Sequence, residues 1–387
     1  MKKTITFFTS SRADYGILNP LMKEISNHPQ FKIKIIVSGS HLSKNYGETI
    51  NEIISDGLMV DEKIEMLLAS DSKIGVAKSL GLGIIGYTDA LDRLKTDLLI
   101  ILGDRYEAFG IAGVATLMNI PIAHMHGGER TDGAYDEYLR HAITKLSHYH
   151  FVATETYRSR VIQMGESPEK VYNVGALGLE NINSTTLYTL DECSEIMGKK
   201  ICPPYFLITY HPPTLSNDNS SIGMAEIFQA LQFFDNHQLI ITYPNFDYGN
   251  TLIMKQIMKE EQERPDKIIV KKSLGIKLYH SLIKKASAVI GNSSSGIIEV
   301  PAFNVPTINI GNRQNGRLCA ATIINCNNKA NDIRRSIELS LDPQFMLEAA
   351  KMEKPYGVGN AAKKIVKILE TINFTPIKTF HDIGYAQ

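Results

Sequence analysis

Short apolar runs alternate with amphipathic segments along the whole chain. The runs are rich in β-branched residues and apolar on consecutive positions, which is typical of parallel strands covered on both faces. Strand–helix alternation of this kind predicts βαβ units and open, doubly wound sheets. We expect strands at 5–9, 32–38, 98–102, 122–125, 151–153, 206–209, 239–242, 268–270, 288–290 and 307–310, and helices at 16–27, 106–118, 137–147, 222–235 and 361–372.

The expected strands fall into two sets, which fit two Rossmann-like domains better than one large sheet. The fold class is therefore α/β, with two parallel sheets facing a central cleft. We expect an N-terminal domain at 1–178 and a C-terminal domain at 179–360, because the boundary stretch 174–184 leads into a Pro203-Pro204 turn. The last segment, 361–387, can dock on either domain. In one of the two arrangements it packs back on the N-terminal domain.

Polar residues recur where these strands end. Parallel sheets bind ligands outside the carboxyl ends of their strands, at the point where the strand order reverses. These polar residues are 10–14, 103–105 and 126–129 in the first half, and His211, Asn245 and 292–295 in the second. We expect a cleft between the two sheet edges that is lined by all six loops.

Composition excludes several classes of protein. Of 387 residues, 41 are Lys or Arg and 41 are Asp or Glu, so the net charge is zero and no basic excess exists for nucleic acid or a membrane surface. The four cysteines form no C-x-x-C pair and no disulfide framework. No apolar run approaches the ~20 residues of a membrane span, and the N-terminal one is shorter than a signal peptide requires. We expect a cytoplasmic protein.

Two glycine-rich stretches have competing interpretations. The stretch 81–86 matches G-x-G-x-x-G but lies inside a helical pattern, which favours helix packing over dinucleotide binding. The stretch 288–299 reads as strand, Gly/Ser turn and helix. Its N–H groups and hydroxyls suit an anion and Glu299 suits sugar hydroxyls, but a capping serine followed by a first-turn Glu explains the pattern equally well.

Asp104 and Arg105 end a fully apolar strand, where an acid–base role competes with a structural ion pair. His124 and His126 lack an obvious third ligand, so we expect no metal. Four cations, Arg12, Arg105, His211 and Arg313, would give the expected cleft a positive lining that suits a diphosphate.

Eight short motifs are spread over nearly the whole chain. They are Ser11-Arg-Ala-Asp-Tyr15, Gly39-Ser-His-Leu42, Gly103-Asp-Arg105, Gly127-Gly-Glu129, Arg140-His-Ala-Ile-Thr-Lys145, Tyr243-Pro-Asn-Phe-Asp247, Gly291-Asn-Ser-Ser294 to Glu299, and Gly311-Asn-Arg-Gln314. In order and spacing these motifs resemble one family, the hydrolysing UDP-N-acetylglucosamine 2-epimerases of sialic-acid biosynthesis. The resemblance implies the two-domain plan called GT-B, with UDP mainly against the C-terminal domain and the amino sugar pointing toward the N-terminal one.

The resemblance also implies roles for particular residues. Asp104 and Asp136 match catalytic acids of the family. His126 stands where relatives often carry Glu, so either His126 or Glu129 would take that role. The implied substrate-binding residues are Ser293 and Ser294 at the β-phosphate, Gly296 in the same turn, Glu299 at the ribose, Arg12, Arg105, His211 and Arg313 around the diphosphate and sugar, and Asn245 near the nucleotide.

The activity implied is conversion of UDP-N-acetylglucosamine and water to N-acetylmannosamine and UDP, through a 2-acetamidoglycal and without a cofactor. The same reaction on UDP-N,N'-diacetylbacillosamine, in the legionaminic acid pathway, is an alternative. A GT-B glycosyltransferase is another, since it shares the fold and nucleotide site. A homo-oligomer, either dimer or tetramer, is expected by the same resemblance.

Overall fold

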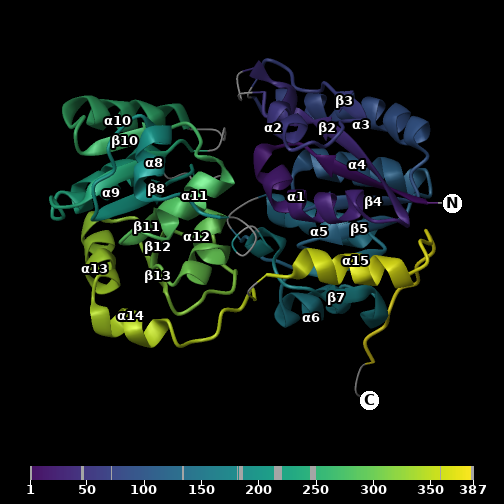
Figure 1. The fold of residues 1–387 in the computed structure, drawn as a ribbon. Coiled ribbons are helices and arrows are strands. Elements are labelled where there is room, and N and C mark those ends of the chain that lie inside the picture. The colour runs from purple at the N-terminus through teal and green to yellow at the C-terminus, as the bar shows by residue number, and fades with distance from the viewer. Residues whose placement is uncertain are drawn as a thin grey trace. The chain divides into compact units, whose positions relative to one another are not determined.

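The structure is a computed structural model that describes residues 2–44, 48–70, 72–132, 135–180, 182, 186–212, 220–244, 250–357 and 359–384. Contacts within the chain divide it into two compact units. The first comprises Met1–Glu129, Asp136–Glu180 and Gly359–Gln387, and the second Arg130–Tyr135 and Asn181–Val358. Each unit is built on one parallel sheet, as the sequence predicts (Figure 1).

The first unit has a seven-stranded sheet whose strand order reverses between β1 and β4. Every neighbouring pair is parallel; Ile5, for example, lies beside Ile33 on one side and Leu98 on the other. In spatial order the strands are β3 (Glu62–Ile64), β2 (Phe31–Ser38), β1 (Lys3–Thr9), β4 (Leu98–Leu102), β5 (Ile122–Met125), β6 (Tyr149–Val152) and β7 (Val171–Asn173).

Helices cover both faces of this sheet, because successive strand residues face opposite sides. Ile5 and Phe7 pack with α1 (Arg12–Ser26) and α15 (Ala361–Thr371), whereas Phe8 packs with α3 (Lys73–Leu94) and α4 (Tyr106–Leu117). In Figure 1 the yellow α15 lies against this unit, far in sequence from its neighbours. The remaining helical segments are η1 (Gly39–Leu42), α2 (Ile50–Ser55), α5 (Asp136–Leu146), α6 (Glu155–Gln163), η3 (Pro168–Lys170) and η4 (Leu177–Leu179).

The second unit repeats the plan with six parallel strands, and its order reverses between β8 and β11. In spatial order they are β10 (Ile268–Lys271), β9 (Gln238–Thr242), β8 (Tyr205–Thr209), β11 (Ala288–Gly291), β12 (Thr307–Ile310) and β13 (Ile323–Cys326). Its helical segments are α8 (Leu190–Met197), α9 (Ser220–Leu231), α10 (Asn250–Glu263), α11 (Gly275–Ile283), α12 (Ser294–Ile298), η5 (Val300–Phe303), α13 (Ala330–Ser340) and α14 (Pro343–Ala349).

The strands that the sequence predicts are all present, but three others are missing from that prediction: β3, β7 and β13. All three lie at sheet edges, where polar residues interrupt the apolar run that marks a buried strand. The glycine motif at 81–86 lies inside α3, where Gly83 and Gly86 let Met66 and Ile64 approach the helix closely. Among the described residues, no helix is long and apolar enough to cross a membrane.

The segment that follows α15 is held on the first unit by a buried ionic cluster. Lys378 donates to both carboxylate oxygens of Glu166 at 2.9 Å and to the carbonyls of Lys145 and Ser147. Lys145 and His150 also donate to Glu166, at 2.5 and 3.0 Å. Although burial disfavours the charged form, these donors lower the pKa of Glu166 from 4.5 to about 2.

Lys378→Met should lower the free energy of unfolding by about 2 kcal/mol near neutral pH, since a hydrogen bond to a charged group contributes roughly 1.5–3 kcal/mol. The folded-state pKa of Glu166 lies below its unfolded value. The stabilisation is therefore complete above about pH 4.5 and is lost as pH falls toward about 2. Denaturant unfolding at several pH values should show the wild-type and variant curves converging in acid. Lys363→Met, at an exposed position of α15, is the control and should change little at any pH. Equal effects of the two changes would contradict the assignment.

Candidate functional site

The loop after β1 is organised by a capping box at the start of α1. Asp14 accepts from the backbone N–H groups of Ser10 and Ser11 at 2.8 and 3.0 Å, and Ser11 caps the helix in return. Arg12, the first helical residue, pairs with Glu52 of α2 at 3.1 Å. The loop therefore lies at the switch point as predicted, but its arginine already has a carboxylate partner.

Asp104, in the loop after β4, forms an ion pair with Arg140 of α5. Arg140 is 2% exposed, whereas the Asp104 side chain is 23% exposed. Arg140 also donates to the carbonyl of Glu129 at 3.1 Å and lies 3.6 Å from Glu137. One buried guanidinium thus joins the loops after β4 and β5 to α5.

His124 supports the loop that carries Asp104. Its ring donates from Nε2 to the carbonyl of Gly103 at 2.8 Å and lies 3.2 Å from the Thr144 hydroxyl. Complete burial lowers the pKa of His124 to about 3, so the ring is neutral at physiological pH. His124 therefore has a structural partner on each nitrogen.

His126 and Glu129, the two alternatives for one catalytic role, are hydrogen-bonded to each other. His126 Nδ1 lies 2.7 Å from Glu129 Oε1, and both residues are buried. The backbone of Gly128 between them adopts φ +78°, and a side chain there would overlap the Tyr157 carbonyl of α6. Arg160 of α6 donates to the Gly128 carbonyl. The loop after β5 is thus fixed from both sides.

Arg105 and Asp136 occupy the remaining predicted positions of the first unit. The Arg105 guanidinium donates two hydrogen bonds to the Glu107 carboxylate, at 2.9 and 3.2 Å. Glu107 is 1% exposed, and its carboxylate lies beside Gly39 at the point where Gly39 approaches the Ser10 carbonyl. Asp136 is the first residue of α5 and precedes Arg140 by one helical turn, so both lie on one face of that helix.

In the second unit, Asn292 ties the ends of β8 and β11 together. Its side chain accepts from the His211 N–H at 2.7 Å and donates to the His211 carbonyl at 2.8 Å. Burial holds the pKa of the His211 ring well below its ordinary value, and the nearby Arg313 lowers it further. His211 is therefore neutral at physiological pH, which corrects its inclusion among the cations.

The turn between β11 and α12 is shaped by Gly291 at φ +142°, where any side chain would overlap the Thr209 carbonyl. Ser293 is the N-cap residue of α12, yet its hydroxyl makes no capping hydrogen bond within the described chain. The first N–H groups of a helix have no acceptor inside the helix. The Ser293 side chain therefore does not cap α12, and Ser293 and Ser294 are half-buried at the start of this helix.

Gly296 and Glu299 lie further along the same segment. Gly296 packs against Thr307 of β12, whose hydroxyl donates to its carbonyl at 2.8 Å, so this glycine has a packing role. Glu299 accepts from His280 of α11 at 2.7 Å. His280 is 1% exposed and the Glu299 side chain 21%, so a buried imidazole orients a partly exposed carboxylate.

Arg313 lies in the turn after β12, where its guanidinium reaches the Asn292 carbonyl at 3.4 Å. Gln314 donates to the same carbonyl at 2.9 Å. Both residues therefore belong to the switch-point edge of the second sheet. Asn245, the other predicted residue of this unit, lies outside the described residues.

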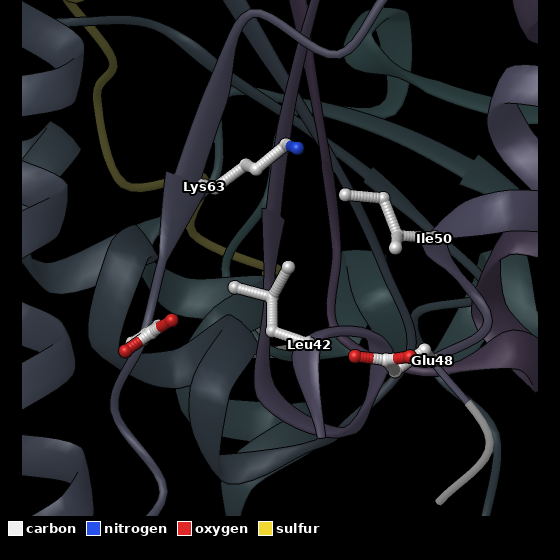
Figure 2. A pocket seen from close by; sticks show the side chains of 5 residues that line it. Leu42, Glu48, Ile50 and Lys63 are labelled. Carbon is white, nitrogen blue, oxygen red and sulfur yellow. The ribbon is translucent and has the colours of Figure 1, made fainter. Parts of the chain in front are cut away.

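A separate hollow of about 510 Å³ opens beside β3 in the first unit. Its walls are Leu42, Glu48, Ile50, Lys63 and Glu65, and Figure 2 shows the Lys63 ammonium reaching over the space beside Ile50. None of the predicted site residues lines it. Over the described ranges, no group of three or more His, Cys, Asp or Glu side chains is arranged to hold a metal ion.

The fold and these edges define a GT-B-like protein with two Rossmann-like units. A family model described as UDP-N-acetylglucosamine 2-epimerase matches residues 23–370, so the chain belongs to that family. It is 37% identical over 385 residues to a GDP/UDP-N,N'-diacetylbacillosamine 2-epimerase (hydrolyzing) of Campylobacter jejuni, covering 99% of this chain and 100% of the relative. It is 35% identical over 381 residues to the polysialic acid biosynthesis protein P7 of Escherichia coli, covering 98% and 97%.

A solved structure gives the same fold. The crystal structure of a UDP-GlcNAc 2-epimerase from Neisseria meningitidis bound to UDP-GlcNAc superposes with a TM-score of 0.82 at 19% identity, covering 96% of this chain and 100% of that one. The family resemblance and the GT-B-like fold class that the sequence predicts are therefore confirmed.

Arg140, Asn292 and His280 each hold a predicted site residue in place, but the sequence analysis assigned none of them a role. Arg140 and Asn292 lie in motifs named there, and an arginine one turn after Asp136 faces the same side of α5. His280 had no signal in the sequence, because Glu299 lies 19 residues away.

Ser294→Ala should weaken UDP binding by about 10- to 10²-fold, since one hydrogen bond to a charged group contributes roughly 1.5–3 kcal/mol. Isothermal titration calorimetry with UDP measures this. Ser287→Ala, at the opposite end of β11, is the matched control and should bind UDP like the wild type. An unchanged affinity in Ser294→Ala would mean that the turn serves the fold alone.

Proposed function

We propose that this protein is a hydrolysing 2-epimerase that converts UDP-N-acetylglucosamine and water to N-acetylmannosamine and UDP. The observation that carries the proposal is the cluster around Arg140, where the buried guanidinium contacts Asp104 and the Glu129 backbone from the helix that Asp136 begins. Carboxylates fixed in this way suit proton transfer at a sugar carbon. Membership of the family adds support.

The reaction requires loss of the C2 proton and departure of UDP from C1, which leaves a 2-acetamidoglycal. Water then adds across the double bond with the opposite configuration at C2, and the free sugar is released. We assign the proton transfers to the domain at 1–178, through Asp104, Asp136 and the His126–Glu129 pair. Arg140 fixes the position of the Asp104 carboxylate, so we assign Asp104 one of the two proton transfers.

The domain at 179–360 would bind UDP through the turn after β11. Ser293, Ser294 and the first N–H groups of α12 would take the β-phosphate, with Arg313 and His211 beside it. Glu299, oriented by His280, would accept the ribose hydroxyls. Donors fixed around a leaving group typically contribute about 10²–10³-fold each to the rate. In this proposal no metal or cofactor takes part.

UDP-N,N'-diacetylbacillosamine is the second candidate substrate. The observation that favours it is the end-to-end match to the Campylobacter jejuni relative, whose name specifies that sugar. Both sugars carry the 2-acetamido group and the C2 hydrogen on which the chemistry acts, so the same catalytic residues serve either. The product of either reaction would feed the biosynthesis of a sialic-acid-type sugar.

Incubation with each UDP-sugar, without an acceptor, tests the function. NMR of the products should show UDP together with the free 2-epimerised sugar, and deuterium from D₂O at C2. Substrate left intact until an acceptor is added would point to a glycosyltransferase. Binding without turnover of either sugar would contradict the proposal.

Asp104→Asn is the companion variant in this assay. It should lower turnover by at least about 10²-fold, the lower end for a lost acid–base group, while UDP affinity measured by calorimetry stays nearly intact. The control is Asp92→Asn, which changes a surface aspartate of α3 paired with Lys95. A parallel loss of turnover and UDP binding in Asp104→Asn would make Asp104 structural.

We also propose that the protein self-associates. Ile74, Leu82 and Ile85 lie along α3 with 69%, 45% and 65% of their surface exposed, a stripe of apolar side chains that water disfavours. Light scattering after size-exclusion chromatography should give a molar mass of a dimer or tetramer. Ile85→Lys should shift it toward the 43.1 kDa monomer. A wild-type monomer at micromolar concentration would contradict self-association.

A further inference from the structure

The backbone at His126 has a conformation that is uncommon for residues other than glycine. Its φ is +64°, in the left-handed region that non-glycine residues enter at a cost. Surrounding contacts hold it there: the His126 N–H donates to Phe151 of β6 at 3.0 Å, and α6 fixes Gly128 two residues later. The ring direction is therefore set by the fold.

Both ring nitrogens of His126 have partners. Nδ1 lies 2.7 Å from Glu129 Oε1, and Nε2 lies 3.4 Å from the backbone nitrogen of Leu177 in η4. The Leu177 N–H can only donate, so Nε2 must be the unprotonated nitrogen. The ring proton is then on Nδ1, which donates to the Glu129 carboxylate.

We propose that His126 is a positioning residue that donates its Nδ1 proton to Glu129, so that Glu129 is the acid–base group of the pair. This inference rests on the proposed function. His126 Nε2 faces a main-chain donor and cannot exchange a proton with substrate while that contact holds. Glu129 is held at one carboxylate oxygen by His126, while Arg140 holds its backbone carbonyl. A donated hydrogen bond favours the ionised carboxylate.

Two substitutions separate positioning from proton transfer. The Asn amide nitrogen occupies a place near Nδ1 and can donate to Glu129, and Asn tolerates a positive φ. The Gln amide nitrogen instead lies near the position of Nε2, so it cannot replace the hydrogen bond that His126 Nδ1 donates to Glu129. Neither side chain titrates, so a catalytic histidine would be lost equally in both variants.

His126→Asn should lower kcat by less than tenfold, and His126→Gln by about 10²-fold, the lower end of what a positioned acid–base group contributes. The limb of the kcat pH profile that reports Glu129 should move to higher pH in the Gln variant and stay near its wild-type position in the Asn variant. Equal, large losses with both variants would overturn the inference, because they would make the ring itself the proton carrier.

A second measurement does not depend on turnover. In protein labelled with ¹⁵N-histidine, the resonances absent from His126→Asn identify His126. Its Nδ1 should appear protonated and its Nε2 unprotonated; the opposite tautomer, or a doubly protonated ring, would overturn the inference. Failure of the wild type to epimerise either UDP-sugar would contradict the proposed function and leave this tautomer test intact.

A remote pair provides the matched control. His28 and Glu370 form a histidine–carboxylate contact of 2.9 Å between Nε2 and Oε1. His28 lies in the loop that leads into β2, at the opposite end of the strands from the switch-point loops. His28→Asn and His28→Gln should leave kcat and its pH profile as in the wild type. A change there comparable to that at His126 would show that the assay responds to stability, and would overturn the positioning assignment.

Discussion

The ion pair between Arg140 and Asp104 is the contact on which the rest of the first unit's edge depends. A guanidinium that is 2% exposed is tolerated only when its charge and donors are matched. Its partners come from the loops after β4 and β5 and from α5, so three segments distant in sequence must fold together to bury it. Burying this guanidinium therefore also brings Asp104 and Glu137 close to the backbone of Glu129. The contacts that bury the charge are the same contacts that assemble this part of the candidate site.

The apolar interior of each sheet explains why the chemistry is confined to the edges. Leu98 to Ile101 of β4 are fully buried, so charged side chains do not fit within the strand. The charged residues of this segment, Asp104 and Arg105, come directly after the strand ends. In the second unit the same constraint puts Asn292 directly after β11, where it joins that strand end to β8. Each edge lies where the strand order reverses, so neighbouring loops diverge and leave room there.

Much of this arrangement was predictable from the sequence, because strand runs and the loops after them are local patterns. The bounds of β4, β5 and β12 follow directly from the apolar runs, and the edge positions of Asp104 and Ser293 follow from the strands. Three features were not predictable. The partners of Arg12 and Arg105 make the first edge less cationic than its sequence indicates. Burial makes His211 neutral, and a long-range contact with Leu177 decides the tautomer of His126. Each depends on tertiary contacts or desolvation, which no local pattern records.

The two edges differ in a way that suits a reaction with two electrostatic demands. Proton transfer at a weakly acidic carbon requires carboxylates, whereas a departing diphosphate requires donors and is repelled by carboxylates. In the first unit the negative groups Asp104 and Glu129 are held by Arg140 and His126. In the second, the turn at Ser293 supplies neutral donors, and the carboxylate of Glu299 is turned onto His280. The ion-paired and hydrogen-bonded carboxylates therefore lie at the edge of one sheet, and the neutral donors of the Ser293 turn at the edge of the other.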